Sequence, residues 1–118
     1  MATFHGIVYV ITNTVNSKVY VGSTKKTLYM RWREHQNAAR NGSAPLHVAM
    51  REVGVENFNI KVVLEVPCNT VRELHEAESR MLKKYCSLKP NGYNANIPVS
   101  LGLGYSAMLR LRRQYGAN

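Results

Sequence analysis

The segment GIVYVITNTVNSKVYVGST, residues 6–24, constrains the fold more than any other part of the chain. Two runs rich in β-branched and aromatic residues, at 7–11 and 18–21, flank the turn-forming residues NTVNS. This arrangement is typical of a β-hairpin. Each strand carries one tyrosine, Tyr9 or Tyr20. Whether the two tyrosines share a face of the sheet depends on the register of the turn, which the sequence leaves open.

Two helices are predicted after the hairpin. The segment TLYMRWREHQNAARNG, residues 27–42, begins with a Ser or Thr cap and can be closed by Gly42. The shorter segment LHVAMREVG ends at Gly54 in the same way. The segment between the hairpin and the first helix is polar and basic, which predicts an exposed connector.

The run FNIKVVLEV, residues 58–66, alternates between apolar and polar positions and predicts a half-buried strand. Its expected inner face consists of Phe58, Ile60, Val62 and Leu64.

A third helix follows, and it contains the most unusual residue of the pattern. Thr70 and Glu73 form a capping box at its start. Its apolar stripe consists of Val71, Leu74, Met81, Leu82 and Tyr85. Glu78 lies in the middle of this stripe, where a carboxylate is costly to bury unless it binds a cation, finds hydrogen-bond donors or lines a cleft. If the helix is rotated by one position, Glu78 is instead an ordinary surface residue.

Length and charge limit the function. A chain of 118 residues suits one domain, which we expect at 1–98, followed by a basic tail at 99–118 with a short helix from about Tyr105. Sixteen Lys and Arg against seven Asp and Glu give a net charge of +9, which favours a polyanionic partner such as nucleic acid. The tail could contact phosphates, pack on the domain or mediate self-association.

We expect no membrane partner. No apolar run approaches the roughly 18 residues of a spanning helix, and the N-terminal residues MATFHG lack the pattern of a signal peptide. The protein is therefore expected to be soluble, intracellular and not secreted.

These features, taken in order, resemble the GIY-YIG endonuclease family. Ile7-Val8-Tyr9 stands at the first signature triplet and Tyr20-Val21-Gly22 at the second. The resemblance continues through Arg31, His35, Glu78 and the Asn91-Gly92-Tyr93-Asn94 turn, and it covers roughly residues 5–97. The departures from the signature letters, Val8 and Val21, are aliphatic exchanges at expected core positions.

The resemblance implies an α+β fold with a small three-stranded antiparallel sheet flanked by helices. It also implies hydrolysis of DNA phosphodiester bonds with one divalent metal ion, Mg²⁺ or alternatively Mn²⁺. Glu78 would bind the metal, and Arg31 would hold the scissile phosphate, because a guanidinium stays protonated and forks onto two oxygens. One carboxylate suffices, since Mg²⁺ keeps several water ligands.

The remaining roles implied by the resemblance concern water and protons. Tyr9 and Tyr20 would position or activate the attacking water, and His35 would assist proton transfer. Gly22 and Asn94 would support the site. Tyrosine is a poor base at its usual pKa of about 10, so Tyr9 could act as one only if the metal, Arg31 or a lysine such as Lys18 favours its phenolate. A water relay through Tyr20 or His35 is the alternative.

The second histidine that some relatives carry after the first helix is not assigned with certainty. Ala44 falls near that position, and His47 lies a few residues further on. On the sequence alone, His47 has the pattern of an ordinary surface or boundary residue.

Basic residues around the predicted site are expected to contact DNA. They are Lys18, Lys25, Lys26, Arg33 and Arg40. A protein that keeps this fold and charge but binds nucleic acid without cutting it is the alternative function. Cutting both strands with one site per chain would require either a homodimer or two sequential nicks, and the sequence leaves both open.

Overall fold

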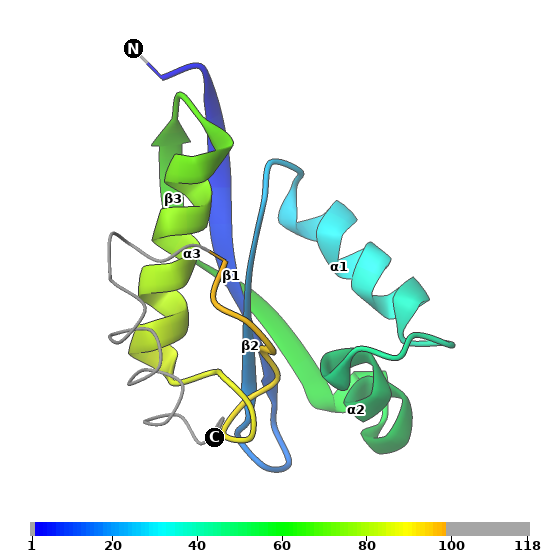
Figure 1. The fold of residues 1–118 in the computed structure, drawn as a ribbon. Coiled ribbons are helices and arrows are strands. Elements are labelled where there is room, and N and C mark those ends of the chain that lie inside the picture. Colours follow the sequence, from blue (N-terminus) through cyan, green and yellow to red (C-terminus); the bar gives the residue numbers. More distant parts are fainter. Residues whose placement is uncertain (1, 99–118) are drawn as a thin grey trace.

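A computed structural model describes residues 2–98 of the chain. Within them, a three-stranded antiparallel sheet with strand order β2-β1-β3 is flanked by α-helices (Figure 1). The elements in chain order are β1 Phe4–Asn13, β2 Val19–Thr24, α1 Leu28–Ala38, α2 Pro45–Val53, the 3₁₀ turn η1 Val55–Asn57, β3 Phe58–Cys68 and α3 Val71–Tyr85. The α+β fold predicted from the sequence is confirmed. The predicted tail and its helix lie outside the described residues.

The register of the hairpin resolves the position of the two tyrosines. Both strands extend several residues beyond the segments predicted, and their pairing sets Tyr9 opposite Gly22 and Ile11 opposite Tyr20. Residues directly opposite each other in an antiparallel pair point to the same side of the sheet. Tyr9 and Tyr20 therefore share a face, and their ring centroids lie 6.4 Å apart.

Helix α1 begins at the predicted cap and ends earlier than predicted. The Thr27 side chain accepts a hydrogen bond from the backbone N–H of Met30 at 3.2 Å. The regular helix stops at Ala38 rather than running to Gly42. Gly42 still contributes to the end of the helix, because its N–H donates to the Ala38 carbonyl at 2.7 Å.

The other two helices begin and end as expected. Pro45 is the first residue of α2, and Gly54, with a φ of 106°, ends it. In α3 the Thr70 side chain accepts a hydrogen bond from the Glu73 N–H at 3.3 Å, which confirms the cap. None of the helices within residues 2–98 combines the length and apolar content needed to cross a membrane.

Phe58, Ile60 and Val62 share a face of β3 as predicted, but Leu64 does not. A β-bulge lies between the partners of Val8 and Tyr9, so that Val63 is the extra residue in β3. An extra residue reverses the alternation of side chains beyond it. As a result Leu64 lies on the face of Val8 rather than on that of Ile60, and Val63 packs against the core on the α3 side. Val62 stays on the face of Ile60, but Val62 and Leu64, both expected inside, are 39% and 38% exposed.

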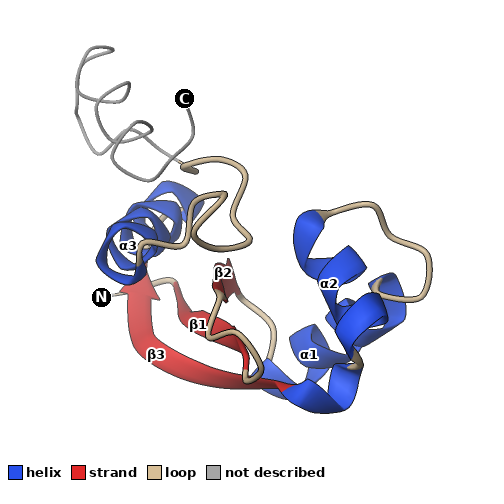
Figure 2. Ribbon diagram, turned by 90° about the horizontal axis from the view of Figure 1, so that it is seen from below, coloured by secondary structure: helices blue, strands red, loops and turns tan. Residues whose placement is uncertain are grey.

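Each face of the sheet is covered by its own helices. Helix α3 lies against one face, and α1 and α2 lie on the side of the other (Figure 2). The first face packs Val8, Val10 and Val21 against α3, whereas the second packs Tyr9 and Ile11 against the helices that precede β3. Strand β2 is the sheet edge between these two groups of helices, so side chains from both can meet there.

Candidate active site

The two tyrosines form a wall that depends on Gly22. Tyr9 is fully buried, and Gly22 lies opposite it across the hairpin. A Cβ atom at Gly22 would lie 2.5 Å from the Tyr9 hydroxyl oxygen and 3.0 Å from the Tyr20 ring. Both distances are shorter than ordinary carbon contacts, so a side chain at this position would displace the tyrosines. The glycine of the second signature triplet is thus explained by the space that Tyr9 needs.

Helix α1 presents Arg31 and His35 to this wall. They are four residues apart, so they lie on the same side of the helix. The Arg31 Nε–H donates to the Tyr9 hydroxyl at 3.0 Å, and His35 Nε2 lies 2.8 Å from the same oxygen. The His35 ring also packs edge-on against Tyr20, with centroids 5.6 Å apart. Tyr9 is therefore held between a cation and an imidazole.

Glu78 approaches the same region from α3. The Ser23 hydroxyl, on β2, donates a hydrogen bond to Glu78 Oε1. Strand alternation places Ser23 on the side of Val21, which packs against α3, and Tyr20 on the side of α1. The candidate site therefore extends around the β2 edge, with Glu78 on one side and Arg31 on the other.

Burial dominates the electrostatics of the tyrosines. It raises the pKa of Tyr9, with a smaller contribution from Tyr20, and it raises the pKa of Tyr20 together with the nearby Glu78 carboxylate. Arg31 opposes both shifts without reversing them. Lys18 lies exposed at the hairpin turn, so the strongest charges acting on Tyr20 are those of Glu78 and Arg31. Both phenols keep their protons at neutral pH.

His35 is neutral for the same reason. Burial, followed by the positive charges of Arg31 and His47, lowers the pKa of His35 to about 3. Burial also raises the pKa of Glu78, although the Ser23 hydrogen bond and nearby positive charges partly offset it. A neutral imidazole has one N–H donor and one acceptor nitrogen, which makes it suitable for passing a proton on.

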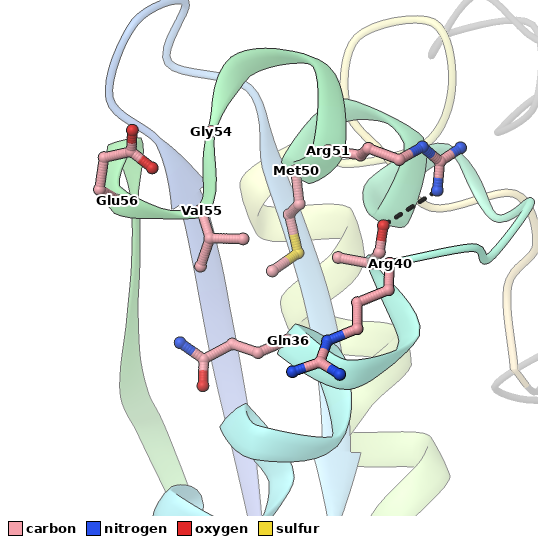
Figure 3. Close-up of a pocket in the computed structure, with 8 residues that line it drawn as sticks. Gln36, Arg40, Met50, Arg51, Gly54, Val55 and Glu56 are labelled. Atoms are coloured by element: carbon pink, nitrogen blue, oxygen red, sulfur yellow. Dashed lines mark hydrogen bonds between the residues drawn. The ribbon is translucent and has the colours of Figure 1, made fainter.

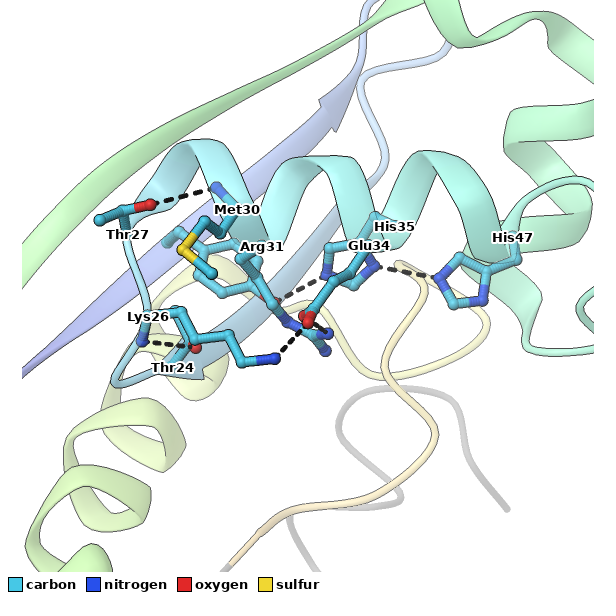
Figure 4. A network of polar contacts seen from close by, with 9 residues as sticks. Thr24, Lys26, Thr27, Met30, Arg31, Glu34, His35 and His47 are labelled. Carbon is cyan, nitrogen blue, oxygen red and sulfur yellow. Dashed lines mark hydrogen bonds and ion pairs between the residues drawn. The ribbon is translucent and has the colours of Figure 1, made fainter.

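His47 belongs to the site, contrary to the surface position that the sequence suggested. Its Nε2 atom lies 3.0 Å from His35 Nδ1 (Figure 4). Since Arg31 already donates to the protonated Tyr9 oxygen, we assign Tyr9 O–H as the donor to His35 Nε2 and His35 Nδ1–H as the donor to His47 Nε2. The four residues Arg31, Tyr9, His35 and His47 then form one continuous hydrogen-bonded chain.

Asn94 attaches the turn after α3 to the strand that carries the site. Its Oδ1 accepts from the Val21 N–H at 2.8 Å, and its Nδ2 donates to the Val21 carbonyl at 2.8 Å. Tyr93 adds a backbone hydrogen bond from its N–H to the Val19 carbonyl at 2.9 Å. The amide of Asn94 thus continues the sheet at the outer edge of β2, as a further strand would.

Two of the predicted DNA-contacting lysines lie in the connector beside the site and are already engaged. Lys26 Nζ forms an ion pair with Glu34 of α1, and Glu34 also accepts from Arg31 Nη1 at 2.9 Å (Figure 4). Lys25 Nζ lies 5.0 Å from the centroid of the Phe4 ring. These contacts of Glu34 were not among the features predicted from the sequence.

The two predicted arginines, Arg33 and Arg40, lie away from the side of α1 that carries Arg31 and His35. Arg33 precedes His35 by two residues and is therefore about 160° around the helix axis from it; its Nη1 donates to the Tyr29 hydroxyl at 3.0 Å. Arg40 lines a pocket of about 410 Å³ between α1, α2 and η1 (Figure 3). Arg51, which also lines this pocket, donates from Nη1 to the carbonyl of Ala39, the C-cap of α1, at 2.9 Å and to the carbonyl of Gly42 at 3.1 Å. Neither arginine contributes to the wall around Tyr9.

Comparison with known proteins identifies the family and the fold. The family model for the GIY-YIG catalytic domain matches residues 5–94. Two solved structures of the catalytic domain of the intron homing endonuclease I-TevI, one of them a mutant, have a similar fold. The mutant has a TM-score of 0.68 at 29% identity and covers 84% of this chain and 100% of its own. The other has a TM-score of 0.66 at 31% identity and covers 77% and 98%.

Curated relatives occur in Invertebrate iridescent virus 6. Protein 146R, whose name refers to an MSV199 domain, is 38% identical over 84 residues, which are 70% of this chain and 34% of that protein. The uncharacterized protein 019R is 35% identical over 91 residues, 75% of this chain and 33% of that protein. The chain thus spans about a third of the length of these relatives. Both the family model and the I-TevI folds match across most of the described residues, and the chain belongs to the GIY-YIG family.

Proposed function

We propose that this protein is a DNA endonuclease that hydrolyses phosphodiester bonds with a single divalent metal ion. The observation that supports this most is the meeting of Arg31, Tyr9, Tyr20 and His35 with a partly buried carboxylate, Glu78, around the β2 edge. A protein that only bound nucleic acid would need the positive charge but not this arrangement. The family to which the chain belongs is one of nucleases.

Glu78 is suited to hold the metal. Among residues 2–98, no group of three or more His, Cys, Asp or Glu side chains is placed to hold an ion, so a soft or tightly enclosed metal site does not fit. A single carboxylate does fit Mg²⁺, which keeps several waters and takes its other ligands from phosphate; Mn²⁺ has similar ligand preferences. Nucleases of this family generally use divalent ions. Such an ion supplies charge neutralisation at the phosphoryl oxygens and lowers the pKa of bound water.

Arg31 is placed to bind the scissile phosphate. Its Nε is fixed on Tyr9, so the outer edge of the guanidinium faces an anion, at present the Glu34 carboxylate. A guanidinium holds two phosphoryl oxygens in a bidentate geometry that an ammonium group cannot reproduce. We therefore expect Arg31 to stabilise the charge that grows on the phosphate during hydrolysis.

Tyr9 would act on water together with His35. Its raised pKa disfavours a free phenolate, so its proton must move as it takes one from water. The acceptor within reach is His35 Nε2, and His35 can in turn pass its Nδ1 proton to His47. The positive charge then rests on His47, which is further from Arg31 than His35 is. Tyr20, on the same face, would position the water.

DNA is the proposed substrate because of the net charge of +9 and the phosphate chemistry of the site. Lys18, Lys25 and Lys26 lie on the hairpin or next to it and are proposed to contact the backbone near the site. Arg33 and Arg40 face away from Arg31 and could only contact a strand that passes on the other side of α1. Since each chain has one Glu78, cutting both strands would need a homodimer or two sequential nicks.

A plasmid assay tests the proposal. Supercoiled DNA is incubated with the whole chain in Mg²⁺, in Mn²⁺ and in EDTA, alongside Arg31→Lys. We expect nicked or linear DNA with either ion, none with EDTA and a large loss with Arg31→Lys. If DNA is shifted in a gel but stays intact with every ion, the protein binds nucleic acid without cutting it.

A further inference from the structure

Glu34 connects two cations at the entrance to the site. Its two carboxylate oxygens have different partners: Oε2 pairs with Lys26 Nζ, and Oε1 accepts from Arg31 Nη1 at 2.9 Å (Figure 4). Lys26 comes from the connector before α1, and its backbone N–H donates to Thr24 Oγ1 at 3.0 Å. The connector and the helix thus direct two positive groups at one anion.

This bridge contributes little to stability. The side chains of Lys26, Glu34 and Arg31 are 50%, 37% and 31% exposed. Ion pairs at such exposure typically add little to the stability of a protein, because water screens the charges and long side chains lose freedom. Glu34 can therefore leave its partners at low cost by rotating into solvent.

The place of the Glu34 carboxylate, between Lys26 and Arg31, suits any anion that shares its charge between two oxygens. A carboxylate and a phosphodiester both share one negative charge between two oxygens that accept hydrogen bonds. Arg31 cannot turn its Nε toward such an anion, since Nε donates to Tyr9. The Nη1 side is thus the part of the guanidinium that faces outward. Glu34 binds there with one carboxylate oxygen and binds the ammonium of Lys26 with the other.

We propose that Lys26 and Arg31 form a single binding site for one DNA backbone phosphate, and that Glu34 occupies this site until DNA displaces it. The proposal rests on the assignment of Arg31 to phosphate in the proposed function and extends it in two ways. First, Lys26 and Arg31 bind the same phosphate rather than two separate ones. Second, Glu34, a residue of the catalytic helix, competes with the substrate.

Removing the charge of Glu34 should tighten DNA binding. The two ion pairs of the free protein no longer compete, and the phosphate meets two unpaired cations. From the usual strength of exposed pairs, Glu34→Gln is expected to lower the Kd for DNA about 2- to 30-fold. Because more positive charge becomes available to DNA, the slope of log K against log salt should steepen by up to about 1.

Duplex binding without metal measures this independently of cleavage. The Kd of a fluorescent 20-base-pair duplex is determined in EDTA over a series of salt concentrations. The matched control is Glu65→Gln, which removes one exposed negative charge from β3, at the opposite edge of the sheet from β2. We expect Glu34→Gln to bind several times more tightly than Glu65→Gln. Equal effects of the two substitutions would overturn the proposal, whether or not the wild type cuts DNA.

A second arm tests the shared phosphate. Lys26→Gln is combined with Glu34→Gln, and the ¹⁵N signal of Arg31 Nε is followed by NMR as inorganic phosphate is added. In Glu34→Gln the signal should shift at lower phosphate concentration than in the wild type, and adding Lys26→Gln should weaken that response. If the Arg31 Nε signal does not shift with added phosphate in any variant, Arg31 is not part of a phosphate-binding site. A shift in a protein that fails to cut plasmid DNA would support the site and reject the nuclease activity.

Discussion

Asn94 makes a quantitative prediction, because its amide is the connection between the turn after α3 and the β2 edge. It is 5% exposed, and its two hydrogen bonds satisfy both backbone groups of Val21, which is fully buried. Asn94→Ala leaves that N–H and that carbonyl without partners, at about 1 to 3 kcal/mol for each buried group when water does not replace them. Partial access of water at the sheet edge reduces the sum, so we expect a loss of roughly 2 to 4 kcal/mol in the free energy of unfolding.

Urea denaturation measures this loss. With an m value of about 1 to 3 kcal/mol/M, the midpoint for Asn94→Ala should fall by roughly 0.7 to 4 M. Asn96→Ala, at an exposed position of the same turn, is the control and should stay close to the wild type. An Asn94→Ala midpoint that coincides with that of Asn96→Ala would refute the argument that the amide holds the β2 edge.

Three further substitutions test the site from different sides. Gly22→Ala should displace Tyr9 and lower both the thermal stability and the cleavage rate per folded molecule. The control is Gly6→Ala, whose Cβ would lie 2.7 Å from the Leu74 side chain and which should lower thermal stability alone. Equal cleavage rates per folded molecule in the two variants would count against the role of Gly22 in placing the tyrosines. His47→Asn should reduce kcat about 10-fold with KM unchanged, while the exposed-histidine control His5→Asn should change neither. Ser23→Ala removes a hydrogen bond that favours the charged form of the Glu78 carboxylate, so it should raise the pKa of Glu78. The acidic limb of the pH–rate profile should then move to higher pH. A limb at the wild-type pH would show that Ser23 does not act on Glu78.

Features that depend on neighbouring residues in the sequence could be predicted. The hairpin follows from β-branched runs and turn formers, and the caps at Thr27 and Thr70 follow from the preference of hydroxyl side chains for helix starts. The helical period alone placed Arg31 and His35 on one side of α1. The position of Glu78 within an apolar stripe pointed to an unusual environment, and Glu78 is indeed partly buried and accepts a hydrogen bond from Ser23.

Features that depend on contacts between distant segments could not be predicted. The bulge at Val63 arises from pairing with β1, some fifty residues earlier, and it moves Leu64 to the face opposite Ile60, although plain alternation places the two residues on the same face. His47 reaches His35 only because α2 packs against α1. Ser23 could have been found from a longer β2, since alternation then sets it on the side of α3.

Binding and cleavage measured on the same variants test whether Glu78 provides the metal-dependent step of DNA hydrolysis. Single-turnover cleavage and duplex Kd are compared for the wild type, Glu78→Gln and Glu76→Gln, a control on the same helix whose carboxylate pairs with Arg72. Our account predicts that Glu78→Gln binds DNA at least as well as the wild type but cleaves it about 1,000-fold more slowly or less, while Glu76→Gln cleaves normally. Normal cleavage by Glu78→Gln, or DNA binding by the wild type with no cleavage in Mg²⁺ or Mn²⁺, would contradict it.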